Sequence, residues 1–535
     1  MTEAKDSVPI LNTIVHSAPI RDSRVFTAVV PSSGFTGILL LGIALVSGIS
    51  LMVPMLTAGP VELDEYGTYW IADDSGPLTL CQRSLDYENI PPLSPWFHRL
   101  FMDIFGKSEW SFRLPSAIWF VLAIGVSYLF GNELRGAIHG GLCAILTAWH
   151  PTALGEIQLA RCYSLSLLLS AICFWAAVRW MKRPAELTWA ILWCVSAVGL
   201  TWTHYLNVAV IGATFLVLVW RMYTRSFRGF VFLMISVLSL ILCCTPLTVS
   251  YLRMAGWGKH FGFQTDVAVL EVISPMWWLG LPAGWCAGRI LDRFSQQPAD
   301  SPRVQSTRVS FVVLFLWGGL PILGALFIRD GELASLANPR YRIGFDVAAG
   351  CLLVTLMTQQ IGTRASLASV VVAIIASWSV ADRLPWEPKR LNTPQAVQWR
   401  DLALHIEQNG TSGEPIFVQS GLGEGFLIPS LYEDTVFMDY AACRLGRFYL
   451  QAEHPRYALP FRWDHGIALR VWFRQRLEEI RESDRPVLWV VSATDTDLNR
   501  LSLKYFQEMA VVVKFEATDR VDLPDVTLIR FEAIE

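Results

Sequence analysis

The chain has 535 residues, of which 53% are hydrophobic and 17% are charged, and its net charge is −3. A soluble protein carries about 25% charged residues, and a nucleic-acid-binding domain shows a clear excess of basic ones. The composition therefore excludes an ordinary soluble protein and gives no sign of nucleic-acid binding. The mean hydropathy of +0.40 and the long apolar runs predict a polytopic α-helical membrane protein.

Apolar runs long enough to cross a bilayer, which takes about 20 residues, recur over residues 35–381. The N-terminal segment 1–34 lacks a short apolar core followed by a cleavage site, so the first run is expected to be a retained helix. About eleven membrane-spanning helices are predicted. They fall at residues 35–56, 114–131, 140–156, 163–180, 187–203, 205–220, 229–248, 270–290, 309–328, 343–360 and 365–381.

Charge in the connecting loops predicts the orientation. Loops on one side are rich in arginine and lysine, which marks the cytoplasmic side of a membrane protein. The loop at residues 57–113, which falls on the other side, is rich in aspartate and glutamate. We therefore expect segment 1–34 in the cytoplasm and loop 57–113 outside, as part of the transmembrane domain 35–381. An odd number of spans leaves residues 382–535 outside as well.

The composition changes sharply after residue 381. Helix-like pieces alternate with strand-like pieces such as PIFVQSG, RPVLWVVSA and VTLIRFEAI. Residues 382–535 are therefore predicted to form a soluble α/β domain, of ordinary single-domain size. The sequence SGLGEG at residues 420–425 follows a strand-like piece and can be a flexible loop or a phosphate-binding loop, and its spacing favours the loop.

The outer loop opens with LDEYGTYW, residues 63–70, which sets Asp64 beside Glu65 and follows them with Tyr66. A carboxylate at the outer end of a helix can accept the proton that a hydroxyl or amine loses as it attacks. Two solvated acids at a helix end are the structural alternative. Farther along, PPLSPWFHRLFMDIFG has apolar residues at helical spacing over 93–104, with His98 between them. This pattern predicts an amphipathic helix on the membrane surface.

Two further outer turns carry ionisable residues next to apolar runs. Such residues are costly at membrane depth and indicate function, and arginine suits phosphate oxygens. Each arginine could instead be an interfacial residue that extends its charge into water. The turns are GEIQLARCYSL, with Glu156, Arg161 and Tyr163, and NPRYRIGF, with Arg340, Tyr341 and Arg342. Carboxylates and cations on one face of the membrane suggest a phosphate-containing lipid as substrate.

The chain resembles the GT-C membrane glycosyltransferases, in the group of the protein mannosyltransferases and the lipid A aminoarabinose transferase. The resemblance covers roughly residues 35–360 and rests on an ordered set of motifs. These are LDEYGTYW, PPLSPWFHRLF, SEWSFRLPSAIWFVLAIGVSYLFG, QLARCYSLSLLL and, more weakly, THYLNVAV and NPRYRIGF. It implies an inverting transferase that takes a sugar from a polyprenyl-phosphate donor and passes it to a lipid, protein or glycan acceptor.

The resemblance also implies roles for individual residues. Asp64 would be the general base, with Glu65 beside it, and Arg340 and Tyr341 would hold the donor phosphate together with Arg161. The further active-site candidates are Tyr163, Glu156, His98 and Tyr66. No cofactor is expected and a metal is not expected to be required. A bacterial inner membrane, with the active site and C-terminal domain extracytoplasmic, is the expected location.

Two other kinds of protein remain open on the sequence alone. A transporter or flippase for lipid-linked sugars would have repeat symmetry and broken helices in matching halves, which the sequence lacks. A sensory or structural membrane protein with an outer domain would leave the paired acids Asp64 and Glu65 unexplained. The transferase accounts for more of the sequence than either.

Overall fold

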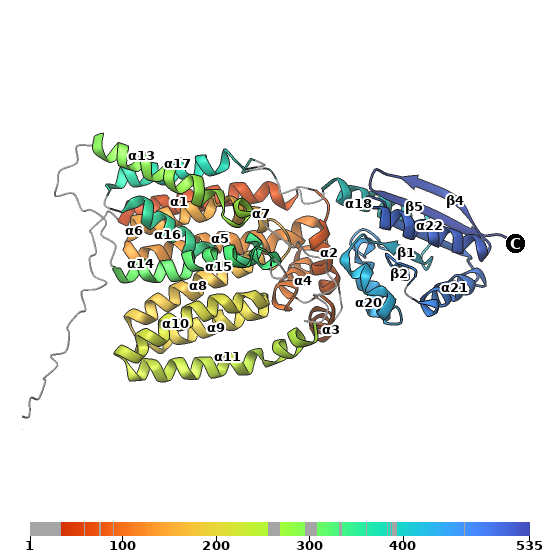
Figure 1. Ribbon diagram of the computed structural model, residues 1–535, viewed down its shortest axis with the longest axis horizontal. Coiled ribbons are helices and arrows are strands. Elements are labelled where there is room, and N and C mark those ends of the chain that lie inside the picture. Colours follow the sequence, from red (N-terminus) through yellow and green to blue (C-terminus); the bar gives the residue numbers. More distant parts are fainter. Residues whose placement is uncertain are drawn as a thin grey trace, which may run out of the picture.

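The computed structural model describes residues 34–535, apart from residues 58, 74–75, 89, 255–267, 295–307, 331–333, 360, 382–383, 386, 388–392 and 465. The predicted cytoplasmic segment 1–34 lies almost entirely outside the described residues. Two parts are visible in Figure 1, a bundle of long helices and a smaller part built around a β-sheet, with the short helices α2, α3 and α4 between them. The loop that carries the candidate site therefore lies where the two parts meet.

Seven helical segments of the described residues are long and apolar enough to cross a membrane. Helices dominate because every backbone N–H and C=O group must be bonded within its own segment when no water is present. Three shorter apolar helices, α6 (Ala137–Ala148), α9 (Leu187–Thr203) and α17 (Thr363–Trp378), lie among them. The seven segments are Gly34–Leu56 (α1), Glu109–Arg135 (α5), Tyr163–Lys182 (α8), Tyr205–Arg225, Phe227–Leu252, Ser310–Ile328 and Pro339–Thr358.

The last four segments combine or shorten individual elements. They comprise η3 (Tyr205–Asn207) with α10 (Val208–Arg225), most of α11 (Phe227–Met254), α14 (Arg308–Leu314) with η6 (Phe315–Gly319) and α15 (Leu320–Ile328), and η8 (Pro339–Phe345) with α16 (Asp346–Thr358). The predicted polytopic helical membrane protein is thus confirmed, whereas the number eleven stays a prediction. The predicted span 270–290 is divided among α12 (Val269–Val272), η5 (Met276–Gly280) and α13 (Leu281–Phe294).

The predicted continuous helix 140–156 is wrong. The chain forms α6 and then a separate short helix, α7 (Pro151–Glu156), with a break at Trp149 and His150. Pro151 causes the break, because proline has no N–H group to donate and disfavours a helical residue before it. His150 begins the new helix, and its Nδ1 accepts a hydrogen bond from the Ala153 N–H at 3.3 Å. This break turns the chain toward the segment that carries Arg161.

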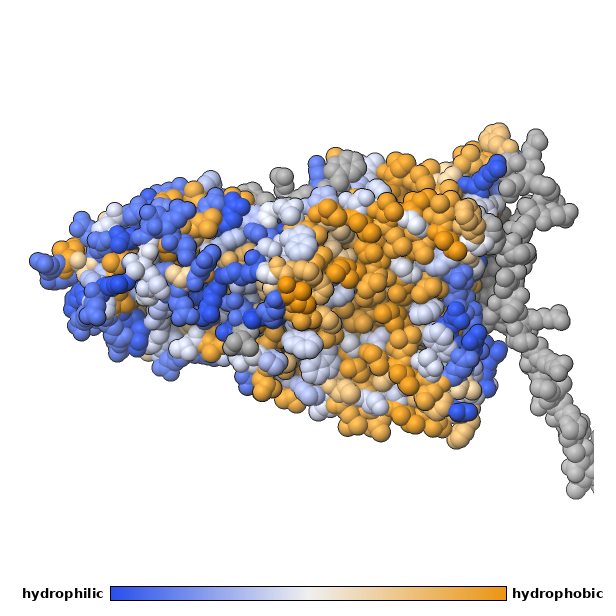
Figure 2. Space-filling model, turned by 180° about the vertical axis from the view of Figure 1, so that it is seen from behind, coloured by the Kyte–Doolittle hydropathy of each residue, from blue (hydrophilic) through white to orange (hydrophobic). Residues whose placement is uncertain are grey.

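The surface of the bundle has the character of a lipid-facing one. Large apolar side chains such as Val46 on α1 and Leu242 on α11 remain exposed, which a soluble protein avoids over so wide an area. Figure 2 shows apolar residues gathered over the bundle and polar residues gathered over the C-terminal part. Inside the bundle, Trp180, Trp193 and Trp317 are fully buried.

The outer loop folds into α2 (Leu63–Ala72), α3 (Pro77–Arg83), a π-helical turn η2 (Ser84–Glu88) and α4 (Leu93–Phe105). The predicted amphipathic helix at 93–104 is confirmed as α4. Its apolar face, with Trp96, Leu100 and Ile104, is exposed, whereas His98 and Met102 are buried on the opposite side. An exposed apolar face beside a membrane bundle fits a helix that rests on the lipid surface.

The C-terminal part contains one five-stranded sheet with strand order β2-β1-β3-β5-β4. β1 pairs in parallel with β2 and β3, whereas β5 is antiparallel to β3 and β4. The register places Val418 opposite Val491, and Val491 opposite Leu528. The strands are β1 (Ile416–Gln419), β2 (Arg456–Ala458), β3 (Val487–Ala493), β4 (Phe515–Asp522) and β5 (Val526–Ala533).

Helices and short turns complete the C-terminal part. The SGLGEG segment turns at Gly421, whose φ of 71° favours glycine, and continues into the short helix η9. The remaining elements are η7 (Ala334–Ala337), α18 (Thr393–Asn409), η9 (Gly423–Phe426), α19 (Ile428–Leu431), α20 (Thr435–Ala441), η10 (Cys443–Leu445), α21 (Ile467–Arg481) and α22 (Asp497–Val512); η7 alone belongs to the bundle.

One hydrophobic core joins the outer loop to the C-terminal part. Tyr66, Tyr69 and Trp70 of α2 belong to the same buried cluster as Phe417 of β1 and Trp489 of β3. A second cluster fills the bundle. The aromatic residues that follow the paired acids are therefore the face by which α2 packs against the C-terminal part.

Candidate active site

The first turn of helix α2 contains Asp64 and Glu65, and the Glu65 carboxylate forms a hydrogen bond that helps to begin the helix. The Glu65 carboxylate accepts a hydrogen bond from the Glu62 N–H at 2.8 Å, which is the reciprocal half of a capping box. Acidic residues in a first helical turn also interact favourably with the positive end of the helix dipole. Asp64 lies in the same turn. The local sequence thus explains why α2 starts where it does.

Glu65 is fully buried and has both oxygens occupied. Arg113 of α5 donates to Oε1 at 2.8 Å and to Oε2 at 2.6 Å, and the Ala160 N–H donates to Oε1 at 2.7 Å. Burial alone would raise the pKa of Glu65, but the Arg113 charge and hydrogen bonds hold it below its ordinary value. This carboxylate joins α2 to α5 and to the turn before α8.

Asp64, the neighbouring acid, makes a different contact. Its Oδ2 lies 2.9 Å from NH1 of Arg340, and each side chain retains 30% of its exposure. The Arg340 guanidinium also lies over the Tyr341 ring, 5.6 Å from its centroid. Asn338 begins the η8 helix by accepting a bond from the Arg340 N–H. The structure therefore brings together two residues that the sequence assigned to one pocket, and both stay accessible.

Arg161 fastens the helix that carries Asp64. Its NH1 donates to the Asp64 carbonyl oxygen at 2.7 Å, to Thr68 Oγ1 at 3.3 Å and to Glu88 Oε1 at 2.9 Å. Burial would lower the pKa of Arg161, but Glu88 and Asp64 hold it above its ordinary value. The side chain therefore stays charged and serves as a brace between α2 and the turn η2.

Glu88 is a central residue that the sequence analysis missed. Besides Arg161 it binds Tyr440 of α20, whose O–H lies 2.6 Å from Oε2, and the same Tyr440 oxygen lies 3.1 Å from Glu424. A Cβ added to Gly67 would lie 2.6 Å from both Glu88 oxygens. Gly67 is thus the glycine that allows Glu88 to approach α2. A glycine inside a helix was the signal that could have indicated such a close approach.

Tyr163, Glu156 and Tyr341 lie near the arginines of the site. Tyr163 is buried at the start of α8, within range of the Arg161 and Arg340 charges. Glu156 is also buried and interacts electrostatically with Arg340. Tyr341 packs near His204, with ring centroids 5.9 Å apart, so the THYLNVAV segment also reaches the site.

His98 and Tyr66 lie on other surfaces. His98 is buried between the Phe112 and Trp119 rings, and its Nδ1 donates to the Phe112 carbonyl at 2.6 Å. Burial lowers the pKa of His98 to about 4. Tyr66 is buried against the C-terminal part, where burial raises its pKa despite the nearby Arg444 charge. Both residues hold the outer loop in place. Arg342, next to the site in sequence, donates instead to the Val272 carbonyl at 2.5 Å.

The described residues contain no group of three or more histidine, cysteine or acidic side chains placed to hold a metal ion. The expectation that no metal is required stays a prediction.

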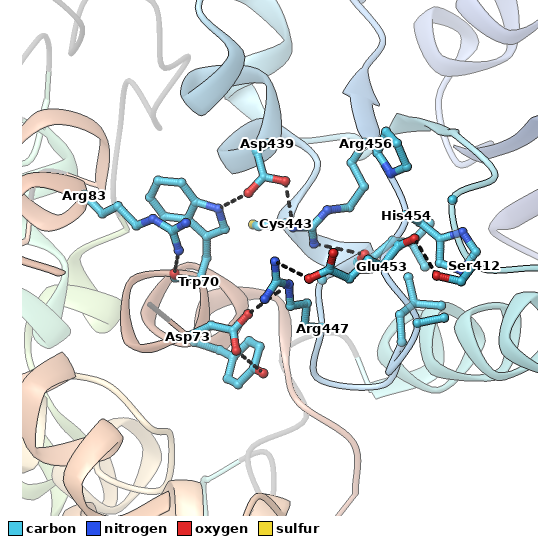
Figure 3. Close-up of a pocket in the computed structure, with 17 residues that line it drawn as sticks. Trp70, Asp73, Arg83, Ser412, Asp439, Cys443, Arg447, Glu453, His454 and Arg456 are labelled. Carbon is cyan, nitrogen blue, oxygen red and sulfur yellow. Dashed lines mark hydrogen bonds and ion pairs between the residues drawn. The ribbon is translucent and has the colours of Figure 1, made fainter. Parts of the chain in front are cut away.

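A cavity of about 700 Å³ lies next to the site, between α2 and the C-terminal part. Figure 3 shows Trp70 and Asp73 on one side of this cavity and Asp439, Arg447 and Arg456 on the other.

Comparisons with known proteins agree with this architecture. Residues 89–248 match the family model of the dolichyl-phosphate-mannose-protein mannosyltransferases. No curated protein matches the chain. Among solved structures, ArnT from Cupriavidus metallidurans bound to undecaprenyl phosphate is 15% identical with a TM-score of 0.53, over 93% of this chain and 98% of that one.

The oligosaccharyltransferase of Archaeoglobus fulgidus, in complex with Zn and sulfate, is 13% identical with a TM-score of 0.43, over 85% of this chain and 68% of that one. At 15% identity, the match to ArnT establishes a shared fold. Together, the family model over residues 89–248 and this shared fold confirm that the chain resembles the GT-C membrane glycosyltransferases.

Proposed function

We propose that the protein is an inverting glycosyltransferase that moves a sugar from a polyprenyl-phosphate-linked donor to an acceptor at the outer face of the membrane. The observation that carries the proposal is the contact between Asp64 and Arg340, 2.9 Å apart and both partly exposed. It brings the residue proposed as base next to the residue proposed to bind the phosphate, which supports a shared pocket. The match to the mannosyltransferase family model and the fold shared with ArnT bound to undecaprenyl phosphate support the same class of reaction.

In the proposed reaction, an acceptor hydroxyl or amine attacks the anomeric carbon of the donor sugar. Asp64 takes the proton that the acceptor loses. The bond between the anomeric carbon and the phosphate oxygen breaks, and its electron pair leaves with the polyprenyl phosphate. Attack from the side opposite the phosphate inverts the configuration of the sugar. A phosphate is a good leaving group, so no strong general acid is needed.

Arg340, assisted by Tyr341, stabilises the charge that develops on the departing phosphate. A guanidinium has five N–H donors in a planar fork, so one Arg340 side chain can bind Asp64 and a phosphate oxygen together. The sequence predicts a phosphate contact for Arg161 as well. Because Arg161 NH1 is bonded to acceptors on α2 and η2, we assign it to holding Asp64 in position. We assign Glu65 the same structural task.

The cellular setting follows from the loop charges. Arginine-rich loops on one side and the acidic outer loop on the other support a site at the extracytoplasmic face. We propose a bacterial inner membrane as the location. The donor lipid would lie in the membrane beside α4, whose exposed Trp96, Leu100 and Ile104 suit contact with acyl chains.

The deciding experiment replaces Asp64 with asparagine. This change keeps the shape of the side chain and removes its ability to take a proton, so the release of polyprenyl phosphate should fall about 10²- to 10⁴-fold. Binding of the donor lipid should persist. The control is Asp103→Asn, which alters an exposed acid paired with Arg99 and should leave turnover unchanged. Full turnover in the Asp64 variant would exclude Asp64 as the base, whereas a wild-type chain that releases no polyprenyl phosphate would favour a flippase.

The sugar and its acceptor are identified by a second experiment. Mass spectrometry of surface glycoconjugates from a deletion strain, beside the strain complemented with the wild-type chain and with Asp64→Asn, should reveal a sugar that only the wild-type chain restores. An unchanged set of glycoconjugates would contradict the proposed transfer.

A further inference from the structure

A cavity lies outside the contact between Asp64 and Arg340, between α2 and the C-terminal part. Its volume of about 700 Å³ is within the range of small-molecule sites, roughly 300 to 1,000 Å³. Helix α2 forms one wall with Tyr69, Trp70 and Asp73, and segments 412–413 and 439–456 form the opposite wall. Arg447 and Glu453 keep 55% and 82% of their side-chain exposure, so the cavity opens to water at their side.

The charges that line the cavity balance. Three arginines face three carboxylates: Arg83, Arg447 and Arg456 against Asp73, Asp439 and Glu453. Arg456 is 2.6 Å from Asp439, and Arg447 lies 3.5 Å from Glu453 and 3.9 Å from Asp73. A phosphate or carboxylate ligand would find Arg447 and Arg456 already paired with carboxylates, while Arg83 donates to the Trp70 carbonyl at 2.8 Å and lies over the Trp70 ring. The lining therefore suits an uncharged polar ligand.

The lining also mixes donors and acceptors at short range. A guanidinium can only donate hydrogen bonds and an ionised carboxylate can only accept them. A sugar hydroxyl does both, so adjacent hydroxyls can bond an arginine and its carboxylate partner at once. The Trp70 N–H is already bonded to Asp439 Oδ2 at 2.7 Å and Tyr69 O–H to Asp73 at 2.8 Å, which fixes both carboxylates in place. Fixed acceptors beside donors are the arrangement that recognises a polyhydroxylated molecule.

The position of the cavity relates it to the proposed base. Asp64 and Trp70 are six residues apart in α2, which is about 9 Å along a helix axis at 1.5 Å per residue. Tyr440 packs on Trp70, with ring centroids 5.1 Å apart, and binds Glu88 on its other side. The wall of the cavity is therefore continuous with the residues that hold Arg161.

We propose that this cavity binds a neutral saccharide, the glycan part of the acceptor that receives the transferred sugar. The proposal rests on the proposed function for its link to catalysis. Bound there, an acceptor glycan would have its growing end within reach of Asp64, while Arg447 and Glu453 would hold it at the open side. Specificity for the acceptor would then lie in the joint between the outer loop and the C-terminal part.

The test uses the full-length chain carrying Asp64→Asn, so that binding is measured without turnover. Calorimetry with mannotriose, maltotriose and N,N′,N″-triacetylchitotriose as neutral probes, and trigalacturonic acid as an anionic one, should show saturable binding of a neutral probe. Replacing Arg447 and Glu453 together with glutamine should weaken it about tenfold or more, since bonds to charged groups are lost. The matched control replaces an exposed pair on α21, Arg474 and Glu478, and should leave binding unchanged.

Three results would overturn the proposal: no saturable binding by any of the four probes, stronger binding of the anionic probe, or binding that the Arg447 and Glu453 changes leave intact. The two proposals fail separately. If Asp64→Asn stops polyprenyl phosphate release while the cavity variant binds normally, only the cavity assignment falls. If Asp64→Asn retains release, the transferase mechanism falls whether or not a saccharide binds.

Discussion

Asp64 and Arg340 are separated by 276 residues in the sequence and by 2.9 Å in the structure. One comes from the first outer loop and the other from the start of the helix pair η8 and α16. Their side chains are exposed to the same degree, 30% each. The residues proposed as base and as phosphate-binding cation therefore come from segments near the start and near the end of the helical bundle sequence.

Replacing Arg340 should weaken donor binding. Arg340→Ala removes charged hydrogen bonds worth about 1.5 to 3 kcal/mol, so the Kd for undecaprenyl phosphate in detergent should rise roughly 10- to 100-fold. Arg340→Lys keeps the charge and loses the planar fork, so its Kd should lie between those of the wild type and of Arg340→Ala. Arg342→Ala is the control, because Arg342 is bonded to the Val272 carbonyl and should keep the wild-type Kd. Equal effects at both positions would remove Arg340 from the phosphate site.

Breaking the buried pair of Glu65 and Arg113 should destabilise the protein. Glu65→Gln leaves the Arg113 charge buried without its partner, which costs about 3 to 5 kcal/mol. The double change Glu65→Leu with Arg113→Met should cost less than the sum of the single changes. The thermal unfolding midpoint in detergent measures both. Asp103→Asn breaks an exposed pair and should cost no more than about 1 kcal/mol; a Glu65 variant as mild as this would contradict the structural role.

Adding one methyl group to Gly67 should lower activity. Alanine would normally stabilise a helix by roughly 0.5 to 1 kcal/mol over glycine, but here the new Cβ would lie 2.6 Å from the Glu88 carboxylate. Glu88 must then move away from Arg161, and polyprenyl phosphate release should fall. Gly212→Ala on α10 meets no atom within 4 Å and should have no such effect. Combining Gly67→Ala with Glu88→Ala removes the clash, so the double variant should release polyprenyl phosphate no more slowly than Glu88→Ala alone.

Burial of the Glu424 carboxyl should make the stability of the protein depend on pH. Glu424 is buried, and the Tyr440 hydroxyl, which lies 3.1 Å from Glu424 Oε1 and 2.6 Å from Glu88 Oε2, has only one hydrogen to donate to the two carboxylates. Burial raises the pKa of Glu424 above its ordinary 4.5, and the Glu88 charge adds to the effect. A raised carboxyl pKa contributes stability that is fully present below the unfolded value and is lost as the pH rises through the folded value.

The comparison of wild type with Glu424→Gln tests this dependence. The wild-type thermal midpoint, measured relative to that of the variant, should fall as the pH rises above 4.5. Other titrating groups are common to both proteins and cancel in the difference. A difference that does not change with pH would show that Glu424 binds no extra proton in the folded state.

The sequence predicted those features that depend on local pattern. Apolar runs predicted the membrane helices, and helical spacing predicted α4, because burial or lipid contact on one face follows directly from the period. Motif and charge patterns also brought Asp64 and Arg340 to attention, although their catalytic roles stay predictions. The prediction of one helix over residues 140–156 did not take Pro151 into account, although this proline was a local signal for a break.

Contacts between distant segments could not be predicted in this way. Glu88 lies in a π-helical turn with no periodic pattern, and its partner Tyr440 is 352 residues away. The paired acids Asp64 and Glu65 look equivalent in the sequence, yet one is partly exposed and the other is buried against Arg113. Their different burial arises from the packing of α5 against α2. That packing cannot be predicted from the sequence around either acid alone.

The core that α2 shares with the sheet constrains how this protein can be recombined or shortened. A chimera that exchanged only the tail, or only the first loop, with a distant relative would pair Tyr66, Tyr69 and Trp70 with a foreign surface and misalign Asp64. A functional chimera should therefore require the first outer loop and the C-terminal part to be exchanged together. Substitutions in one of these segments should be tolerated only where the other segment still packs against it.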